Sequence, residues 1–145
     1  MVQEYQNWGE IFKIEFDIKV TKLPSGWVNV FHVTANGENS QYGDRIPSFF
    51  VNPDGKLYFM SAISGDRNHI ETFDFELEKM YQIVIQQFKE SEIYWYEIVI
   101  DGESKVKIVN TQQRSFSNVK FYASDPWFDP FSSEFGCIGN ITISK

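Results

Sequence analysis

Residues 81–111 constrain the fold more than any other stretch, because they read as three consecutive β-strands. Three apolar runs, Tyr81–Phe88, Tyr94–Ile100 and Lys105–Asn110, are separated by polar residues. In the middle run, large apolar residues alternate with a second set of side chains, which is the period expected of a half-buried strand. Asp101-Gly102 joins the last two runs, and glycine accepts the positive φ of a tight hairpin turn. The stretch therefore predicts an antiparallel meander.

The rest of the chain also reads as strands. Residues 10–22 are the clearest case, since apolar residues alternate with charged ones. Residues 27–34 are apolar on both faces, which indicates a central strand, and alternation places Trp27 on one face with Phe31 and Val33. Further strands are predicted at residues 48–52, 56–62, 70–75, 116–123 and 137–144, with a helical turn or a loop at 76–80. About ten short strands with turn signals between them predict an all-β sandwich or barrel.

Length and charge limit the function. At 145 residues the chain fits a single domain, residues 1–145. Its net charge of -7 argues against a nucleic-acid partner, because phosphate binding needs Lys and Arg, and against an anionic membrane surface. No apolar run approaches the about 18 residues of a membrane span, so no membrane insertion is expected.

The sequence carries few signals of the cellular compartment. Residues 1–6 are polar and acidic, so no signal peptide is visible. Cys137 is the one cysteine, which excludes an internal disulfide and mildly favours a reducing compartment; it is expected in the core. Asn140-Ile141-Thr142 is an N-glycosylation sequon, which matters only if the chain is secreted.

Three polar loops are the first places to look for a site. The longest is predicted at residues 35–47, a second at 64–69, and an aromatic, acidic one at 124–131. Ordered loops of such length usually carry function.

Several stretches resemble the concanavalin A-like lectin and laminin G-like superfamily. Tyr81–Ile85 and Glu97–Gly102 are similar to the middle strands of such modules, and Phe12–Ile18 is similar to their early strand. Phe116–Trp127 and Gly139–Ile141 are similar to the closing strands of some animal extracellular modules. The resemblance implies an antiparallel jelly-roll sandwich of two curved sheets.

The same resemblance implies a function. Members are mostly non-catalytic and bind glycans or proteins through a rim of loops, often with one calcium ion. We therefore expect an extracellular or secreted recognition module, not an enzyme, that binds a glycan with calcium assisting. The alternative is a protein-interaction or adhesion module of a larger extracellular protein. A glycoside hydrolase is a third reading, since some relatives are hydrolases.

Glycan recognition would pair an aromatic platform with side chains that bond hydroxyl groups. The loops supply a set with this chemistry: Tyr42, Asp44, Arg45, Asp66, Arg67, Asn68 and Trp127. The structural alternative is that Trp127 folds back onto the core while Asp44-Arg45 and Asp66-Arg67 form local ion pairs.

Calcium would need about six to eight oxygen ligands. Loop residues 36–44 and 66–68 offer such groups, and Asp125 and Asp129 are the candidate metal ligands.

Catalysis finds less support. Glycosidases use two carboxylates that flank the scissile bond. Glu15-x-Asp17 and Asp74-x-Glu76 offer such pairs, but charged residues on a solvated sheet face are the strongly favoured explanation. The histidines are His32, expected as a packed or hydrogen-bonded residue, and His69; no Gly-x-Ser-x-Gly elbow is present.

Overall fold

The computed structural model describes residues 2–145, and twelve strands account for most of them. The strands are β1 (Val2–Trp8), β2 (Phe12–Val20), β3 (Val28–Thr34), β4 (Ser48–Asn52), β5 (Lys56–Ile63), β6 (Asp66–Asp74), β7 (Met80–Glu90), β8 (Ile93–Ile100), β9 (Glu103–Val109), β10 (Phe116–Tyr122), β11 (Asp129–Pro130) and β12 (Gly136–Ser144).

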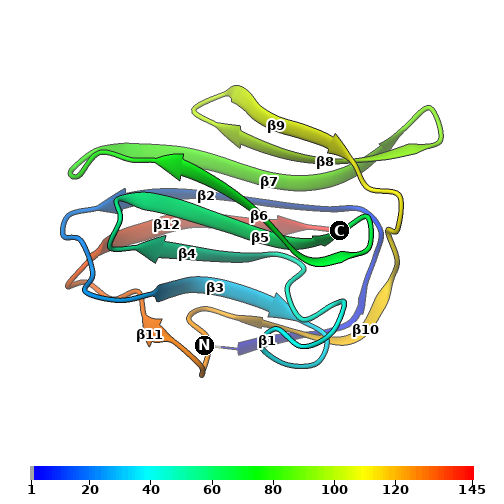
Figure 1. Cartoon of the computed structure of the whole chain (residues 1–145), viewed down its shortest axis with the longest axis horizontal. Coiled ribbons are helices and arrows are strands. Elements are labelled where there is room, and N and C mark those ends of the chain that lie inside the picture. Colours follow the sequence, from blue (N-terminus) through cyan, green and yellow to red (C-terminus); the bar gives the residue numbers. More distant parts are fainter. Residues whose placement is uncertain (1) are drawn as a thin grey trace.

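The strands form two sheets that lie face to face (Figure 1). The larger sheet has seven strands in the order β1-β10-β3-β4-β5-β6, with β11 paired to β3, and the smaller has five in the order β12-β2-β7-β8-β9. All pairs are antiparallel except β11 with β3. The chain is therefore a β-sandwich, as predicted.

The core fills the space between the sheets and follows from strand alternation. Along β2 every second residue is buried, from Phe12 to Val20, while the charged residues between them are partly exposed. Aromatic rings meet in the centre, where Phe16 packs at 5.3 Å from Phe31 and 5.2 Å from Phe49, measured between ring centroids. Burying such side chains is the main favourable contribution to folding.

The predicted meander is confirmed as β7, β8 and β9. Ile98 pairs with Ile85 on one side and with Val106 on the other. Asp101 and Gly102 have φ values of 51° and 80°, the left-handed pair that a type I′ hairpin turn needs. The sequence pattern and the turn chemistry thus agree in this part of the chain.

Three predictions from the sequence need correction. Residues 2–8 form β1, an edge strand that the polar sequence did not suggest. The predicted loop 64–69 is a short turn, since β6 already begins at Asp66, opposite Ile63. Cys137 lies on edge strand β12 and is exposed, not in the core, because it pairs with Lys19 and therefore shares the outer face of the smaller sheet.

A bulge in β3 changes which residues share a face. The register with β4 shifts between Asn29 and Phe31, so two successive stretches of the strand are out of phase. Phe31 and Val33, which were predicted to share a face, both point into the core. Trp27 does not: it packs on Phe50 and Tyr58, on the outer face of the larger sheet.

Among residues 2–145, no helix is long and apolar enough to cross a membrane.

Candidate functional site

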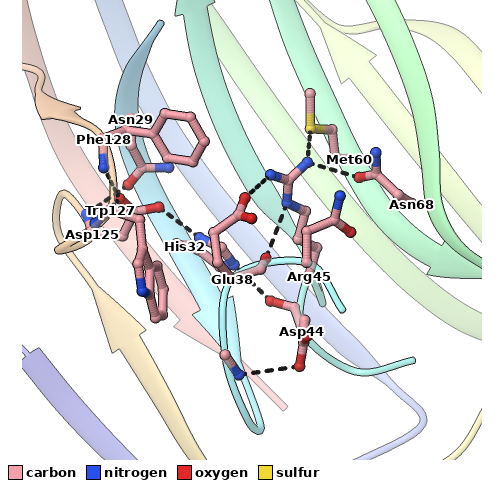
Figure 2. Close-up of polar contacts among 12 residues, drawn as sticks. Asn29, His32, Glu38, Asp44, Arg45, Met60, Asn68, Asp125, Trp127 and Phe128 are labelled. Atoms are coloured by element: carbon pink, nitrogen blue, oxygen red, sulfur yellow. Dashed lines mark hydrogen bonds and ion pairs between the residues drawn. The ribbon is translucent and has the colours of Figure 1, made fainter. Parts of the chain in front are cut away.

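The candidate site lies on the outer face of the larger sheet, where two loops meet over β3. These are loop 35–47, between β3 and β4, and loop 124–131, which follows β10. Figure 2 shows His32 of β3 between them. Its Nδ1 lies 2.7 Å from a carboxylate oxygen of Asp125, and its Nε2 lies 2.6 Å from the carbonyl oxygen of Asp44.

Asp44 holds loop 35–47 together from the inside. Its buried carboxylate accepts hydrogen bonds from the backbone N–H groups of Gly37 (3.1 Å), Ser40 (2.6 Å) and Gln41 (2.8 Å). Burial by itself would raise the pKa of this carboxyl, but the bonds from Ser40, Gln41 and Gly37 together hold the pKa below its ordinary value. Asp44 therefore caps loop amides and forms no ion pair with Arg45.

Arg45 is the centre of a second cluster. Its guanidinium is buried and donates to the carboxylate of Glu38, to the side-chain oxygen of Asn68 at 2.9 Å, and to the sulfur of Met60 (Figure 2). The guanidinium carbon lies 5.3 Å from the centre of the Phe50 ring. The fold thus brings together Arg45 and Asn68, both predicted site residues, and adds Glu38, which the sequence analysis missed.

Asp125 organises loop 124–131 in the same way. One carboxylate oxygen faces His32, and the other accepts the N–H groups of Trp127 (3.1 Å) and Phe128 (2.9 Å). Its own N–H donates to the side chain of Asn29 at 2.8 Å. With its side chain fully buried and both oxygens engaged, Asp125 holds the loop in shape.

Asp129, the other candidate metal ligand, is exposed and belongs to β11, where it pairs with Val28. Within residues 2–145 no cluster of three or more His, Cys, Asp or Glu side chains is placed to hold a metal ion. The calcium ion stays a prediction.

Aromatic side chains cover the face beside these clusters. Trp127 is 43% exposed and packs against His32, with 5.4 Å between ring centroids. Trp27 is 38% exposed and packs at 4.6 Å against Tyr58. Phe128 closes over Phe50 at 5.0 Å. Trp127 is thus exposed, and Trp27 is a second exposed tryptophan on this face, which sequence reasoning missed.

The remaining predicted residues have other roles. Tyr42 packs against the core edge, donates to the carbonyl of Gln112 at 2.9 Å and lies under Arg114; burial raises the pKa of its phenol. Asp66 accepts the N–H of Asn68 at 2.9 Å, and Arg67 reaches the carbonyl of Asn39 in loop 35–47 at 3.3 Å. The Asp66-Arg67 ion pair is therefore replaced by contacts that tie β6 to the loop.

The carboxylate pairs considered for hydrolysis have ordinary surface partners. Glu15 lies 3.3 Å from Lys13, and Asp17 accepts a bond from Asn140 at 2.7 Å. Asp74 pairs with Lys56 at 2.8 Å. Glu15 and Asp17 are on the outer face of the smaller sheet, away from the cluster of loops.

Comparison with solved structures of similar shape identifies the fold. Sheep galectin-11, solved with glycerol, matches 99% of this chain and 96% of its own at 10% identity, with a TM-score of 0.55. A SAP-like pentraxin from Limulus polyphemus matches 97% of this chain and 66% of its own at 12% identity, with a TM-score of 0.60. The chain has the concanavalin A-like jelly-roll fold.

The jelly-roll fold is shared with an enzyme as well. An alginate lyase from Alteromonas sp. 272 matches 96% of this chain and 72% of its own at 11% identity, with a TM-score of 0.56. No protein-family model and no curated protein matches the sequence. At such identities the likeness establishes the jelly-roll fold alone, so function has to be inferred from the site.

Proposed function

We propose that this protein is a non-catalytic carbohydrate-binding module whose sugar site is the outer face of the larger sheet. The observation that carries this is the exposure of two tryptophans, Trp27 and Trp127, on one aromatic face. The flat face of an exposed indole ring suits the C–H face of a sugar ring, and its N–H can bond a hydroxyl group.

Polar groups beside the tryptophans supply the directional part of recognition. Glu38 is one-third exposed and is held by Arg45, so its carboxylate is fixed in place. Asn68 is fixed by the same guanidinium. Carboxylates and amides held in this way can accept and donate hydrogen bonds to hydroxyl groups without further loss of side-chain entropy.

The similar structures are consistent with a sugar partner. Two of them are a galectin and a pentraxin. A third is botulinum neurotoxin type C, whose cell entry depends on interaction with two ganglioside molecules; its structure matches 79% of this chain and 27% of its own at 16% identity, with a TM-score of 0.50. Other structures of similar shape are an alginate lyase and a sialidase, so an enzymatic function remains the alternative.

The absence of catalysis is part of the proposal. Asp44 and Asp125, the acids buried in the two loops, are occupied by backbone N–H groups, and Glu38 is paired with Arg45. A glycosidase needs one carboxylic acid to give a proton and a second carboxylate to act as nucleophile or base. Carboxylates held as acceptors inside loops are poorly suited to either role.

A protein partner is the second candidate function. A groove opens between the edge strands β1 and β12, lined by uncharged residues: Gln3, Tyr5, Phe121, Ala123, Ile141 and Ile143. Apolar grooves beside open strand edges suit protein contacts. An adhesion module would use this side of the molecule and leave the tryptophan face free.

Both candidate functions, sugar binding and protein binding, go with an extracellular location. Asn140 of the sequon is exposed on β12, which suits the attachment of a glycan if the chain is secreted.

A glycan array with the whole chain tests the first candidate. Binding to a coherent set of glycans, lost on replacing Trp27 or Trp127, is the expected result. An array without binders, in calcium and in EDTA, would turn the search to protein partners. Release of product from a bound oligosaccharide would instead identify an enzyme.

A further inference from the structure

The aromatic side chains on the outer face of the larger sheet form two cross-strand pairs of rings. Tyr58 of β5 lies opposite Phe50 of β4, and Tyr122 of β10 lies opposite His32 of β3. The register of β3 with β4 places His32 opposite Ser48, so the second pair is displaced by two residues along β4 from the first. The rings therefore cross four neighbouring strands, in the order β5, β4, β3 and β10.

Each exposed tryptophan covers one of these pairs. The ring of Trp27 lies 4.6 Å from Tyr58 and 5.8 Å from Phe50, measured between centroids. The ring of Trp127 lies 5.4 Å from His32 and 5.8 Å from Tyr122. All four contacts are tilted or edge-to-face, an arrangement that favours aromatic packing, so the rings beneath hold both indoles in place.

The two tryptophans are too far apart for one sugar ring to reach both. The pairs beneath them are centred two strands apart, which amounts to about 10 Å across the strands, and their displacement adds about 7 Å along the strands. A pyranose unit lengthens a linear sugar chain by about one strand spacing. A chain that contacts both Trp27 and Trp127 therefore needs at least three units.

The surface between the tryptophans offers contacts to the middle of such a chain. Phe128, next to Trp127 in the sequence, is partly exposed and packs at 5.0 Å on Phe50. The Arg45 guanidinium lies 5.3 Å from the same Phe50 ring and holds the carboxylate of Glu38. A ring surface and a fixed hydrogen-bond acceptor thus lie between the two indoles.

Charges around the rings disfavour acidic sugars. Glu38 is one-third exposed, and Asp129 is exposed on β11, where it pairs with the residue that follows Trp27. Cations of the surrounding elements face acids of their own: Arg45 faces Glu38, Lys22 faces Glu134, Lys56 faces Asp74 and Lys120 lies opposite Glu4. A sugar carboxylate or sulfate would meet these acids without gaining a new cation, whereas a neutral sugar meets no such repulsion.

We propose, building on the proposed sugar site, that the outer face of the larger sheet binds a neutral, linear oligosaccharide of at least three units. The chain crosses β4 and β3, and Trp27 and Trp127 stack on different units of it. Once one unit is bound, the second contact is intramolecular and adds to the affinity without a second association cost. Affinity therefore depends on chain length.

Calorimetric titration of the whole protein with chains of one to six units tests this length dependence. Three neutral series serve as probes, built of β-1,4-linked glucose, β-1,4-linked N-acetylglucosamine and α-1,4-linked glucose, with oligoguluronates as the acidic counterpart. Within the series that binds, affinity should rise about tenfold between the disaccharide and the tetrasaccharide and then level off. The oligoguluronates should bind more weakly than neutral chains of equal length.

Two variants separate the contacts. A disaccharide reaches one tryptophan, so Trp27→Ala or Trp127→Ala, but not both, should weaken its binding. Both variants should weaken binding of the tetrasaccharide, and each should remove the rise with chain length. Trp95→Ala, on the outer face of the smaller sheet, is the matched control and should keep the wild-type length dependence.

The outcomes distinguish this inference from the proposed function. Equal affinity for a disaccharide and a hexasaccharide, loss of disaccharide binding in both variants, or a preference for acidic chains would overturn the inference and leave the sugar site standing. Failure of every neutral chain and every oligoguluronate to bind would count against the sugar site itself, and the inference would fall with it.

Discussion

Arg45 donates a 2.9 Å hydrogen bond to the side chain of Asn68 and so fastens loop 35–47 to the start of β6. The two residues are 23 positions apart. The polar stretch Asp66–Asn68 forms the start of β6, where a loop was predicted, and pairs with β5. Arg45 also fixes Glu38 on the surface beside the tryptophans, through the other side of the same guanidinium.

Replacing Arg45 by Ala should therefore destabilise the fold. Glu38 and Asn68 lose their donor, and an unsatisfied partner of this kind costs about 1–3 kcal/mol. Arg45→Lys should recover only part of the loss, since lysine lacks the forked donor geometry. Urea denaturation measures the change, and Arg67→Ala, at an exposed arginine, should stay within about 0.5 kcal/mol of wild type. Equal losses for Arg45 and Arg67 would contradict this account.

Acid should weaken the hold of Asp44 on loop 35–47. Since its pKa is lower in the folded protein than in the unfolded chain, its contribution is present above the ordinary carboxyl pKa and disappears as pH falls through the folded value. Asp44→Asn should be less stable than wild type at neutral pH, and the gap should narrow in acid. Thermal melting of both proteins over a pH series checks the sign; a gap that widens in acid would show it to be wrong.

The two exposed tryptophans should be needed for sugar binding. Trp27→Ala and Trp127→Ala should each weaken glycan binding about tenfold, because each removes a stacking contact of about 1.4 kcal/mol. Trp95, on the outer face of the smaller sheet under Lys107, provides the matched control. Calorimetric titration with the glycan found on the array distinguishes the faces, and an effect confined to Trp95→Ala would place the site on the other sheet.

The aromatic centre of the sandwich should dominate stability. Phe16→Ala removes a fully buried ring that contacts Phe31 and Phe49, at a cost of about 3–5 kcal/mol. Ile93→Ala, at an exposed position in the β7–β8 hairpin, should cost little. Chemical denaturation of the two variants side by side provides the comparison, and similar midpoints would argue against the observed core.

Calcium can be tested without a known sugar. An ion that binds the folded state at a hundredfold excess over its Kd stabilises by about 2.7 kcal/mol, which raises the melting temperature by several degrees. A rise in millimolar calcium that EDTA reverses would support the predicted ion. An unchanged midpoint would remove calcium as a strong ligand and leave recognition to the aromatic face.

The strands could be predicted where burial imposes alternation. β2 and the meander have one face in the core, so their sequences alternate and the predictions are confirmed. β1 lies at a sheet edge and is mostly exposed, so its sequence carries little alternation. Trp27 was assigned to the wrong face because a bulge adds a residue to β3, and no residue pattern announces that insertion.

Site residues were harder to predict for a different reason. The polar loop residues were selected as exposed donors and acceptors, yet Asp44, Arg45 and Asp125 are buried. Long loops expose many backbone N–H groups to each other, and these need internal acceptors. Asp44 and Asp125 supply those acceptors. The side chains that face solvent are instead Glu38, Asn68 and the tryptophans.

The open edge at β12 has a consequence for the behaviour of the protein in concentrated solution. β12, from Gly136 to Ser144, carries no charged residue, whereas β6 and β9 at the other edges carry several. Charged edge residues normally block strand pairing between molecules. The register shift between Gly139 and Thr142 is the remaining interruption on β12. Straightening that bulge would leave a smooth, neutral strand, so this short irregularity protects the chain against aggregation.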